Sequence, residues 1–546
     1  MSPIERPPLR MTEAVEPINP LDFVLDPGPM ARLYEDVRWH PDNPDGYKDG
    51  FSLANAVPLR PYTDIQAEYV RRCGESSFSP LEFWDEHFVT STPDEGLYIA
   101  PEGLSIDDYT LAMRGLLVYR APEGSMNPLD VPYECPIPGQ RFINLFAWDM
   151  YHATLGFRAD GDWPRILNVV DGMKHLIDRV GCVPNFNGAG ISRPQPPYFP
   201  RAVRMVAEQY GQEALAHYLP QLEKEYAYWM SGGRVVHMPD GSFMNRYWDD
   251  ADGPRLESYK EDVELGKLVV HGLTGEARAR RLKKFYKHMR AGAASGWDYS
   301  ARWFEDGMNL ATINTTDILP IDLNCLLACT EETLALAHMA AGNEKRAHEY
   351  FHRLELRRRA INTYHWDPRT GVFRDHNFVK QQQTKVLSAA MSYALYAGVA
   401  NRQQSMRVLD WFRRTDFLTP GGISTTDADT IERWDGRKNI WLPTNWATAR
   451  GMVRQGHEFG GAEGQALLEF GEEVRAAYLD AKSKEFAAHR VIYEKHDGDN
   501  AVKIYDGGEY PNQVLGMSIE GRHALQKWDT RDPDDCMPLR SLIFKA

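Results

Sequence analysis

PRILNVVDGMKHLIDRVG, residues 164 to 181, has the pattern of a helix with one apolar face. Its apolar residues recur at the i, i+3, i+4, i+7 spacing of an amphipathic helix: Ile166, Val169, Val170, Met173, Leu176, Ile177 and Val180. Pro164 stands where a helix tolerates proline, at its start, and Gly181 stands just past the end. The stretch therefore predicts one complete helix.

The same helical period recurs through most of the chain. It runs through QEALAHYLPQLEKEYAYWM (212–230), DLNCLLACTEETLALAHMA (322–340), TKVLSAAMSYALYAGVA (384–400) and EGQALLEFGEEVRAAYL (463–479). Pro220 is expected to kink or divide the first of these. Strand patterns are scarce, so the sequence predicts an all-α protein.

Short aromatic and polar stretches separate these predicted helices. They are FAWDMY (146–151), VPNFNGAG (183–190), MPDGSFMNRYWDD (238–250), SGWDYSARWF (295–304), HWDPRTGVFRD (365–375) and IERWDGRKNIWLP (431–443). A closed toroid of paired helices gives this rhythm, because the loops at one end line the mouth of a bowl. An α-solenoid is the alternative, but the chain shows no repeat of fixed period to favour it.

Composition excludes several kinds of partner. The formal net charge of -15 argues against nucleic acid, since binding to phosphates needs a cationic surface. The chain has no run of eighteen apolar residues, and charges and prolines occupy the first twenty, so we expect no membrane partner and a cytoplasmic location. Residues 1–60 are predicted to form an extended N-terminal arm and 61–546 the main domain.

The six cysteines form no paired CxxC motifs, which disfavours a disulfide framework or a zinc ribbon. Cys325 and Cys329 share a helix face, where two thiols four residues apart are more often buried packing than metal ligands. We therefore predict reduced cysteines and no metal site. The sequence says nothing firm about assembly beyond a monomer or a weak homo-oligomer.

The aromatic loops suit a sugar ligand better than a phosphate or an acyl group. The chain lacks a phosphate-binding loop, a dinucleotide fingerprint, an HExxH motif and a nucleophilic-serine elbow. Aromatic rings stack on the apolar faces of sugars, and Asp, Asn, Gln and Arg bind hydroxyls. For any one loop, capping and packing are the better explanation of the same residues, and it is the recurrence of this mixture in six loops that favours a carbohydrate site.

Cleaving a glycosidic bond requires a protonated carboxyl and a second carboxylate. Asp298 suits the acid because the surrounding rings reduce its hydration and so raise its pKa, although a structural carboxylate is the simpler reading of one acid among aromatics. In YDGGEYPNQ (505–513), Glu509 follows two glycines that allow close approach of the backbone to a ligand. Asp506 competes with Glu509 for the second role.

Several long motifs resemble the inverting α,α-trehalases, which hydrolyse trehalose to two glucose molecules in an (α/α)6 toroid. LYEDVRWHPDNPDGYKDGFSLANAVP (33–58) is similar to the family's N-terminal segment, and PGQRFINLFAWDMY (138–151) to its first signature, PGGRFxExYxWDxY. The resemblance continues in VPNFNGAGISRPQPPYF (183–199), NRYWDDADGPRLESYKED (245–262), ASGWDYSARWF (294–304), LPIDLNCLL (319–327) and GGEYPNQ (507–513). It covers most of the chain in order.

The resemblance implies specific roles without a metal or an organic cofactor. Asp298 would be the general acid and Glu509 the general base. Contacts to a disaccharide would come from Arg141, Trp148, Asp149, Asn185, Arg193, Gln195, Arg255, Glu257 and the Gly296 backbone. Arginine forks suit this task because they bridge hydroxyl pairs or hold carboxylates in place.

Departures from the family pattern leave the substrate open. The family's QWDxPNGWAP appears as RWDGRKNIWLP (433–443), with Arg433 for glutamine, Arg437 for proline, an apparent insertion at Lys438, and Leu442 for alanine. LGMSIEG (515–521) replaces GFGWTNG, and Asn144 replaces a glutamate. The alternatives are therefore hydrolysis of another short α-glucoside, or a trehalose-binding protein without turnover.

Overall fold

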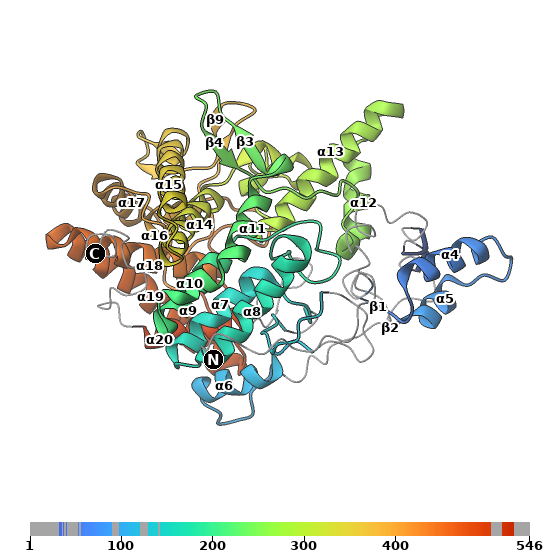
Figure 1. Ribbon diagram of the computed structural model, residues 1–546, viewed down its shortest axis with the longest axis horizontal. Helices are drawn as coiled ribbons and strands as arrows, with labels where there is room; N and C mark the ends of the chain where they lie inside the picture. The colour runs from blue at the N-terminus through green and yellow to red at the C-terminus, as the bar shows by residue number, and fades with distance from the viewer. Residues whose placement is uncertain are drawn as a thin grey trace.

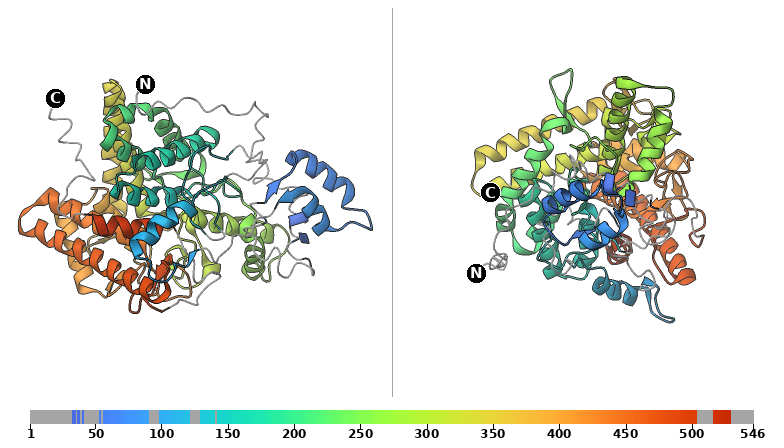
Figure 2. Two further views of the ribbon diagram at one scale, coloured as in Figure 1. Left: turned by 90° about the horizontal axis from the view of Figure 1, so that it is seen from below. Right: turned by 90° about the vertical axis from the view of Figure 1, so that its right-hand side faces the viewer.

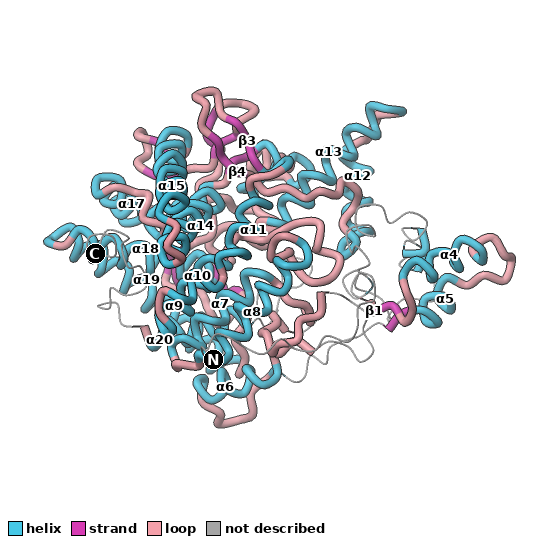
Figure 3. The backbone as a smooth tube through the Cα atoms, viewed as in Figure 1, coloured by secondary structure: helices cyan, strands magenta, loops and turns pink. Residues whose placement is uncertain are grey.

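The computed structural model describes residues 32–34, 36–37, 40, 53, 56–89, 98–120, 129–139, 142–503 and 516–528. Helices dominate these residues, and the strands are two or three residues long (Figure 3). No helix in these ranges is long and apolar enough to cross a membrane.

Six helices form the inner ring of the fold (Figure 1). Each contacts the next, and the last, α20, packs on the first, α7, so the ring closes. The inner helices are buried along most of their length because both sides of each meet other helices: α14 is buried from Ile321 to His338. Their bounds are α7 (Ala147–Ala159), α9 (Phe199–Tyr210), α14 (Ile321–Ala340), α16 (Tyr393–Tyr396), α18 (Leu442–Phe459) and α20 (Gly516–Lys527).

Further helices surround this ring and bury one face each. They are α6 (Ile106–Leu116), α8 (Trp163–Val180), α10 (Glu213–His217), α11 (Leu219–Trp229), α12 (Tyr259–Val269), α13 (Gly275–Ala294), α15 (Glu344–Tyr364), α17 (Arg402–Arg414) and α19 (Gly461–His489). α8 contacts α7 and α9, α15 contacts α14, and α19 contacts α18. The predicted (α/α)6 toroid is confirmed.

Helix α8 forms where the sequence predicts it. The Asp162 side chain caps its first turn by accepting from the Arg165 N–H at 3.4 Å, and Gly181 ends it in a left-handed conformation. The predicted apolar face is buried from Ile166 to Ile177, whereas Val180 at the end is only partly buried. Pro220 divides the predicted helix at 212–230 into α10 and α11, as expected.

The predicted helix at 384–400 is mostly wrong. Only η7 (Ala389–Ser392), a 3-10 turn, and the four-residue α16 are helical there. Backbone N–H groups at and before the start of η7 bond to distant residues instead of to the preceding turn. The N–H of Leu387 donates to the Asp427 carboxylate at 2.8 Å, and that of Ala389 to the Thr425 carbonyl at 2.9 Å. These donors cannot also serve a helix, and tertiary bonds outweigh the local apolar period.

The strands pair as short antiparallel ladders at helix ends. They are β1 (Val57–Pro58) with β2 (Phe88–Val89), β3 (Val235–His237) with β4 (Phe243–Asn245), β6 (Trp366–Asp367) with β7 (Val372–Phe373), β10 (Leu418–Thr419) with β11 (Gly422–Ile423), β12 (Ile440–Trp441) with β13 (Lys495–His496), and β5 (Ile318–Leu319), β8 (His376–Asn377) and β9 (Gln382–Gln383) in order. The remaining 3-10 turns are η2 (Gly232–Arg234), η3 (Leu256–Ser258), η4 (Ala301–Trp303), η5 (Leu310–Thr312) and η6 (Thr315–Asp317).

Helices α4 (Tyr62–Arg72) and α5 (Pro80–His87) lie to one side of the ring, in blue in Figures 1 and 2. They share a hydrophobic cluster with Leu33, Tyr34 and Leu53, and the Tyr34 hydroxyl donates to the Leu256 carbonyl at 2.5 Å. The division into 1–60 and 61–546 stays a prediction, and this cluster crosses it.

The cysteines in the described ranges are free thiols, and Cys325 and Cys329 are buried in α14. Their predicted role in apolar packing is confirmed.

Candidate active site

A cavity of about 360 Å³ opens where inner helices α7 and α20 begin. Every predicted site residue that the structure describes lines it: Trp148, Asp149, Asn185, Arg193, Gln195, Arg255, Glu257, Gly296 and Asp298. Arg141 and Glu509 lie outside the described residues. Of the six aromatic loops, 238–250 and 365–375 do not supply its lining.

Asp298 reaches the cavity from a loop of buried rings. Its side chain is 39 % exposed, while its neighbours Trp297 and Tyr299 are buried. Burial raises the pKa of Asp298 to about 6, against the opposing effect of Arg255 and Arg193. Nη1 of Arg255 lies 4.0 Å from Oδ2 of Asp298. A carboxyl with this pKa is partly protonated near neutral pH, as a general acid needs to be.

The residues after Asp298 anchor its loop to the ring. Arg302, fully buried, donates through both sides of its guanidinium to Asp322 and Asp375, at 2.6 to 2.9 Å. Its guanidinium also stacks 4.6 Å from the Trp297 ring. The Asp298 loop is therefore held by a buried ion cluster, while Asp298 itself is left out of it.

Gly296 meets two constraints at once. Its φ is +74°, which favours glycine, and a Cβ at this position would lie 2.4 Å from the ring of Trp148. The Trp148 ring in turn packs against Trp441, 4.8 Å away, and Trp441 against Trp434 at 3.9 Å. The glycine thus lets the Asp298 loop lie directly on an aromatic wall of the cavity.

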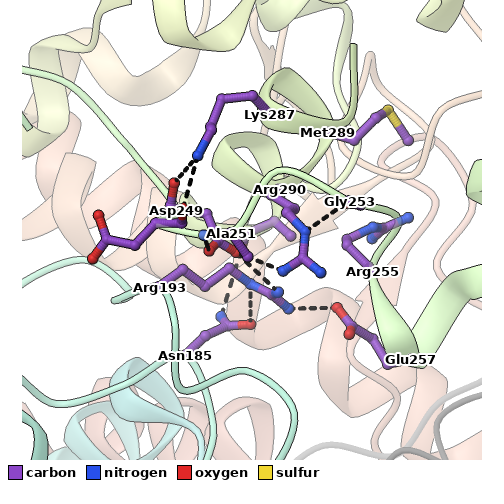
Figure 4. Close-up of polar contacts among 12 residues, drawn as sticks. Asn185, Arg193, Asp249, Ala251, Gly253, Arg255, Glu257, Lys287, Met289 and Arg290 are labelled. Carbon is purple, nitrogen blue, oxygen red and sulfur yellow. Dashed lines mark hydrogen bonds and ion pairs between the residues drawn. The ribbon is translucent and has the colours of Figure 1, made fainter. Parts of the chain in front are cut away.

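Two arginines of the cavity lining, Arg193 and Arg255, are held in fixed orientations (Figure 4). Nε of Arg193 donates to Oδ1 of Asn185 at 3.1 Å, and its Nη2 contacts Glu257. Arg255 forms a two-pronged contact with Asp262, at 2.7 and 3.0 Å. Burial raises the pKa of Glu257, but Arg193 and Arg255 outweigh it, so its pKa lies below the usual range.

Several buried polar atoms on the lining have no hydrogen-bond partner within the described ranges, among them Nη1 of Arg193, Oε2 of Glu257, Oδ1 of Asp149 and Nε1 of Trp434. An unmet donor or acceptor at a buried position is costly unless a ligand or water completes it. These atoms suit the hydroxyl groups of a polyol. No group of three His, Cys, Asp or Glu side chains in the described ranges is placed to hold a metal ion.

Glu494, which the sequence pattern did not single out, is a further carboxylate on the cavity lining. Glu494 is only 6 % exposed, and its Oε2 lies 3.3 Å from Nζ of Lys495. Pairing of β12 with β13 sets Lys495 opposite Trp441, which brings Glu494 to the aromatic wall. The only local signal is an acid in YEKHDG (493–498) after a long helix, and such acids are usually solvated.

Asp149 lies near Glu494 in the lining. Burial raises the pKa of Asp149 well above its usual range, and the charge of Glu494 adds to the effect. Burial therefore favours the protonated form of Asp149, which can donate a hydrogen bond to a ligand.

Some of the departures from the family pattern lie on the cavity lining and others lie outside it. Arg433 lines the cavity, whereas Arg437 and Lys438 make exposed ion pairs with Asp499 and Asp429. Leu442 packs against Gly521, since a Cβ on that glycine would lie 2.0 Å from Cδ2 of Leu442. Asn144, although buried, is not part of the lining.

Comparison with known proteins gives consistent matches. The model of the trehalase family matches residues 106–515. A periplasmic trehalase of Citrobacter koseri is 32% identical over 517 residues, covering 92% of this chain and 85% of the relative. One of Escherichia coli is 33% identical over 512 residues, covering 91% and 85%. The solved neutral trehalase of Saccharomyces cerevisiae shares the fold, with a TM-score of 0.60 at 18% identity over 95% of this chain and 98% of that one.

Proposed function

Because the chain belongs to the trehalase family, we propose that it hydrolyses trehalose to two glucose molecules in the cavity around Asp298, with inversion. The single observation that carries this is the placement of Asp298 and Glu494 in one aromatic-walled cavity. An inverting glycosidase needs this pair: one carboxyl to protonate the leaving oxygen and one carboxylate to activate water.

Asp298 is the general acid. Its pKa of about 6 leaves a protonated fraction at neutral pH, and its exposed share faces the cavity. As the glycosidic bond breaks, Asp298 gives its proton to the leaving oxygen and becomes a carboxylate. Arg255 then stabilises the new negative charge from 4.0 Å.

Among the described residues, Glu494 is our proposed general base. Of the other carboxylates on the lining, Asp262 and Glu257 are held by arginines, and burial raises the pKa of Asp149 well above its usual range and that of Glu432 to about 7. Glu261 also lies on the lining. Nζ of Lys495 forms an ion pair with Oε2 of Glu494 at 3.3 Å. Glu509 remains a predicted base outside the described residues.

The aromatic wall and the arginines bind the sugar. Trp148 offers a ring to a glucose face, while Arg193, Glu257 and Asp149 have unmet polar atoms for hydroxyls. Asn185 and Gln195 also line the cavity, but their contacts are internal: Gln195 accepts from the N–H of Trp148 at 3.0 Å. They position the sugar contacts.

Another short α-glucoside is the second candidate substrate. Arg433, where the family has glutamine, lines the cavity between Glu432 and Trp434, and so changes one wall. A panel of α-linked disaccharides assayed beside trehalose separates the two: the best kcat/KM identifies the substrate. Ligand-induced thermal stabilisation without glucose release would instead indicate a binding protein.

The roles of the acid and the base are tested separately, with a substrate whose leaving group needs no proton and with a nucleophile that needs no general base. Asp298→Asn should lose trehalose hydrolysis but still hydrolyse α-glucosyl fluoride, because fluoride leaves without a proton. Glu494→Ala should hydrolyse neither, and added azide should restore turnover and give the β-glucosyl azide by direct displacement. If Glu509→Ala shows the azide rescue and Glu494→Ala does not, the base is Glu509.

The cytoplasmic location and the monomeric or weakly associating state stay predictions. The relatives from Citrobacter koseri and Escherichia coli are named periplasmic, so cell fractionation is the deciding measurement for the first. Sedimentation of the purified protein decides the second.

A further inference from the structure

Behind the arginine side of the cavity, four charged residues form an alternating row: Glu257, Arg193, Asp249 and Arg290 (Figure 4). Oδ2 of Asp249 lies 3.5 Å from Nη1 of Arg193 and 3.0 Å from Nη1 of Arg290. Arg193 and Glu257 line the cavity, but Asp249 and Arg290 do not. The inner half of the row therefore cannot touch a substrate.

Asp249 is held rigidly in this row. Its side chain is fully buried, and its Oδ1 accepts the N–H of Ala251 at 2.8 Å. Burial raises the pKa of Asp249, but Arg290 and Arg193 outweigh this effect, so its pKa lies below the usual range. Asp249 is thus a fixed negative charge behind Arg193, on the side away from Glu257.

Arg290 extends the row to the backbone that carries Arg255. Its Nε donates to the Gly253 carbonyl and its Nη2 to the Pro254 carbonyl, both at 2.7 Å. Arg290 itself belongs to α13, the helix that ends just before the Asp298 loop. The Arg290 guanidinium thereby links three features: helix α13, which leads to Asp298; residues 253–254, which precede Arg255; and Asp249, which pairs with Arg193.

We propose that Asp249 and Arg290 are positioning residues for hydrolysis: Asp249 orients the Arg193 fork, and Arg290 fixes Arg255 relative to Asp298. This inference rests on the proposed function. Asn185 and Glu257 hold Nε and Nη2 of Arg193, and the Asp249 carboxylate forms an ion pair with the remaining nitrogen, Nη1, at 3.5 Å. An arginine held by charges and acceptors around its guanidinium keeps one orientation. Even a small displacement of an arginine from its productive position lowers its contribution to the reaction rate.

The test compares Asp249→Asn and Arg290→Lys with a matched control, Glu331→Gln. Glu331 is an equally buried carboxylate, paired with Arg357 at 2.9 Å, and it does not line the cavity. Circular dichroism first establishes that each variant is folded at the assay temperature. Arg290→Lys keeps the positive charge beside Asp249 and supplies a folded variant if Asp249→Asn does not fold.

We expect Asp249→Asn to lower kcat/KM for trehalose about 100-fold, mainly through KM, because Arg193 binds sugar in the ground state as well. Arg290→Lys should lower it about 10-fold, mainly through kcat, because it loosens the segment beside the acid. The control should lose thermal stability and keep both constants within about twofold.

A double-mutant cycle separates positioning from general destabilisation. In an Arg193→Lys background, which has no fork to orient, Asp249→Asn should add little further loss, whereas Glu331→Gln should behave the same in both backgrounds. A folded Asp249→Asn or Arg290→Lys with wild-type constants, or additive losses in the cycle, would overturn the inference. If the wild-type protein does not cleave trehalose, the proposed function itself fails.

Discussion

At the residue scale, the pKa of Asp298 reflects two opposing effects. Burial raises it to about 6, while Arg255 and Arg193 limit the rise. We predict that kcat/KM for trehalose falls as the pH rises through about 6, because the acid loses its proton. Arg255→Met should move this alkaline limb to higher pH, since removing a nearby positive charge favours the protonated form. The pH dependence of kcat/KM measures both, and an unmoved or lowered limb would contradict the assignment.

The same carboxyl should weaken the fold at neutral pH. Its folded pKa of about 6 exceeds the reference value of 3.8, so its contribution to stability is fully present below 3.8 and is lost as pH rises through 6. The thermal stability of Asp298→Asn relative to the wild type should therefore increase between pH 4 and pH 8. Melting temperatures across that range check the sign, and a difference that shrinks with pH would be evidence against it.

Gly296 offers a residue-scale test with a close control. Gly296→Ala should cost about 1–2 kcal/mol for its positive φ and also displace Trp148, which raises KM for trehalose. Gly272 has nearly the same φ, +78°, but a Cβ at this position would have no neighbouring atom within 4 Å. Urea unfolding should show a similar backbone cost for Gly272→Ala, with unchanged kinetics. Equal kinetics in both variants would show that the Trp148 contact is unimportant.

At the scale of elements, one departure from the family pattern is a packing change between α18 and α20. Leu442, where the family has alanine, fills the space above Gly521. Gly521→Ala should therefore destabilise the protein by about 1–3 kcal/mol through overpacking, and Leu442→Ala by about 2–5 kcal/mol through a cavity. The double variant should lose less than the sum, because the new methyl group occupies part of the cavity. Urea unfolding of the three variants measures the coupling, and strict additivity would refute it.

At the scale of the whole molecule, closing the ring joins residues hundreds of positions apart. Arg114 on α6 forks onto Glu520 of α20 at 2.7 Å and also contacts Asp160, after α7, at 2.6 Å. Arg114→Met leaves a buried carboxylate without its partner and should cost about 3–5 kcal/mol. The exposed pair of Arg346 and Glu349 is the control, where Arg346→Met should cost under about 1 kcal/mol. Equal losses in urea unfolding would argue that α20 does not secure the ring.

The amino-acid sequence alone determined most of the helices, the aromatic character of the loops and the choice of Asp298 as the proposed acid, whereas the predicted base Glu509 lies outside the described residues. The apolar period of 164–181 fixes α8 because each contact it needs lies three or four residues away. Asp298 was recognisable because its aromatic neighbours, which desolvate it, are adjacent in the chain. Information of this kind is local, so it survives without a structure.

Only the tertiary structure revealed that Glu494 lines the cavity, that Asp249 pairs with Arg290, and that the segment before α16 is irregular. Glu494 reaches the cavity through strand pairing between β12 and β13, and nothing in YEKHDG distinguishes it from a solvated acid. The segment at 384–388 is not helical because its donors bond to distant residues: Thr384 to the Asp375 carbonyl and Leu387 to the Asp427 carboxylate. These outcomes depend on partners distant in sequence, whose positions are decided only when the ring closes.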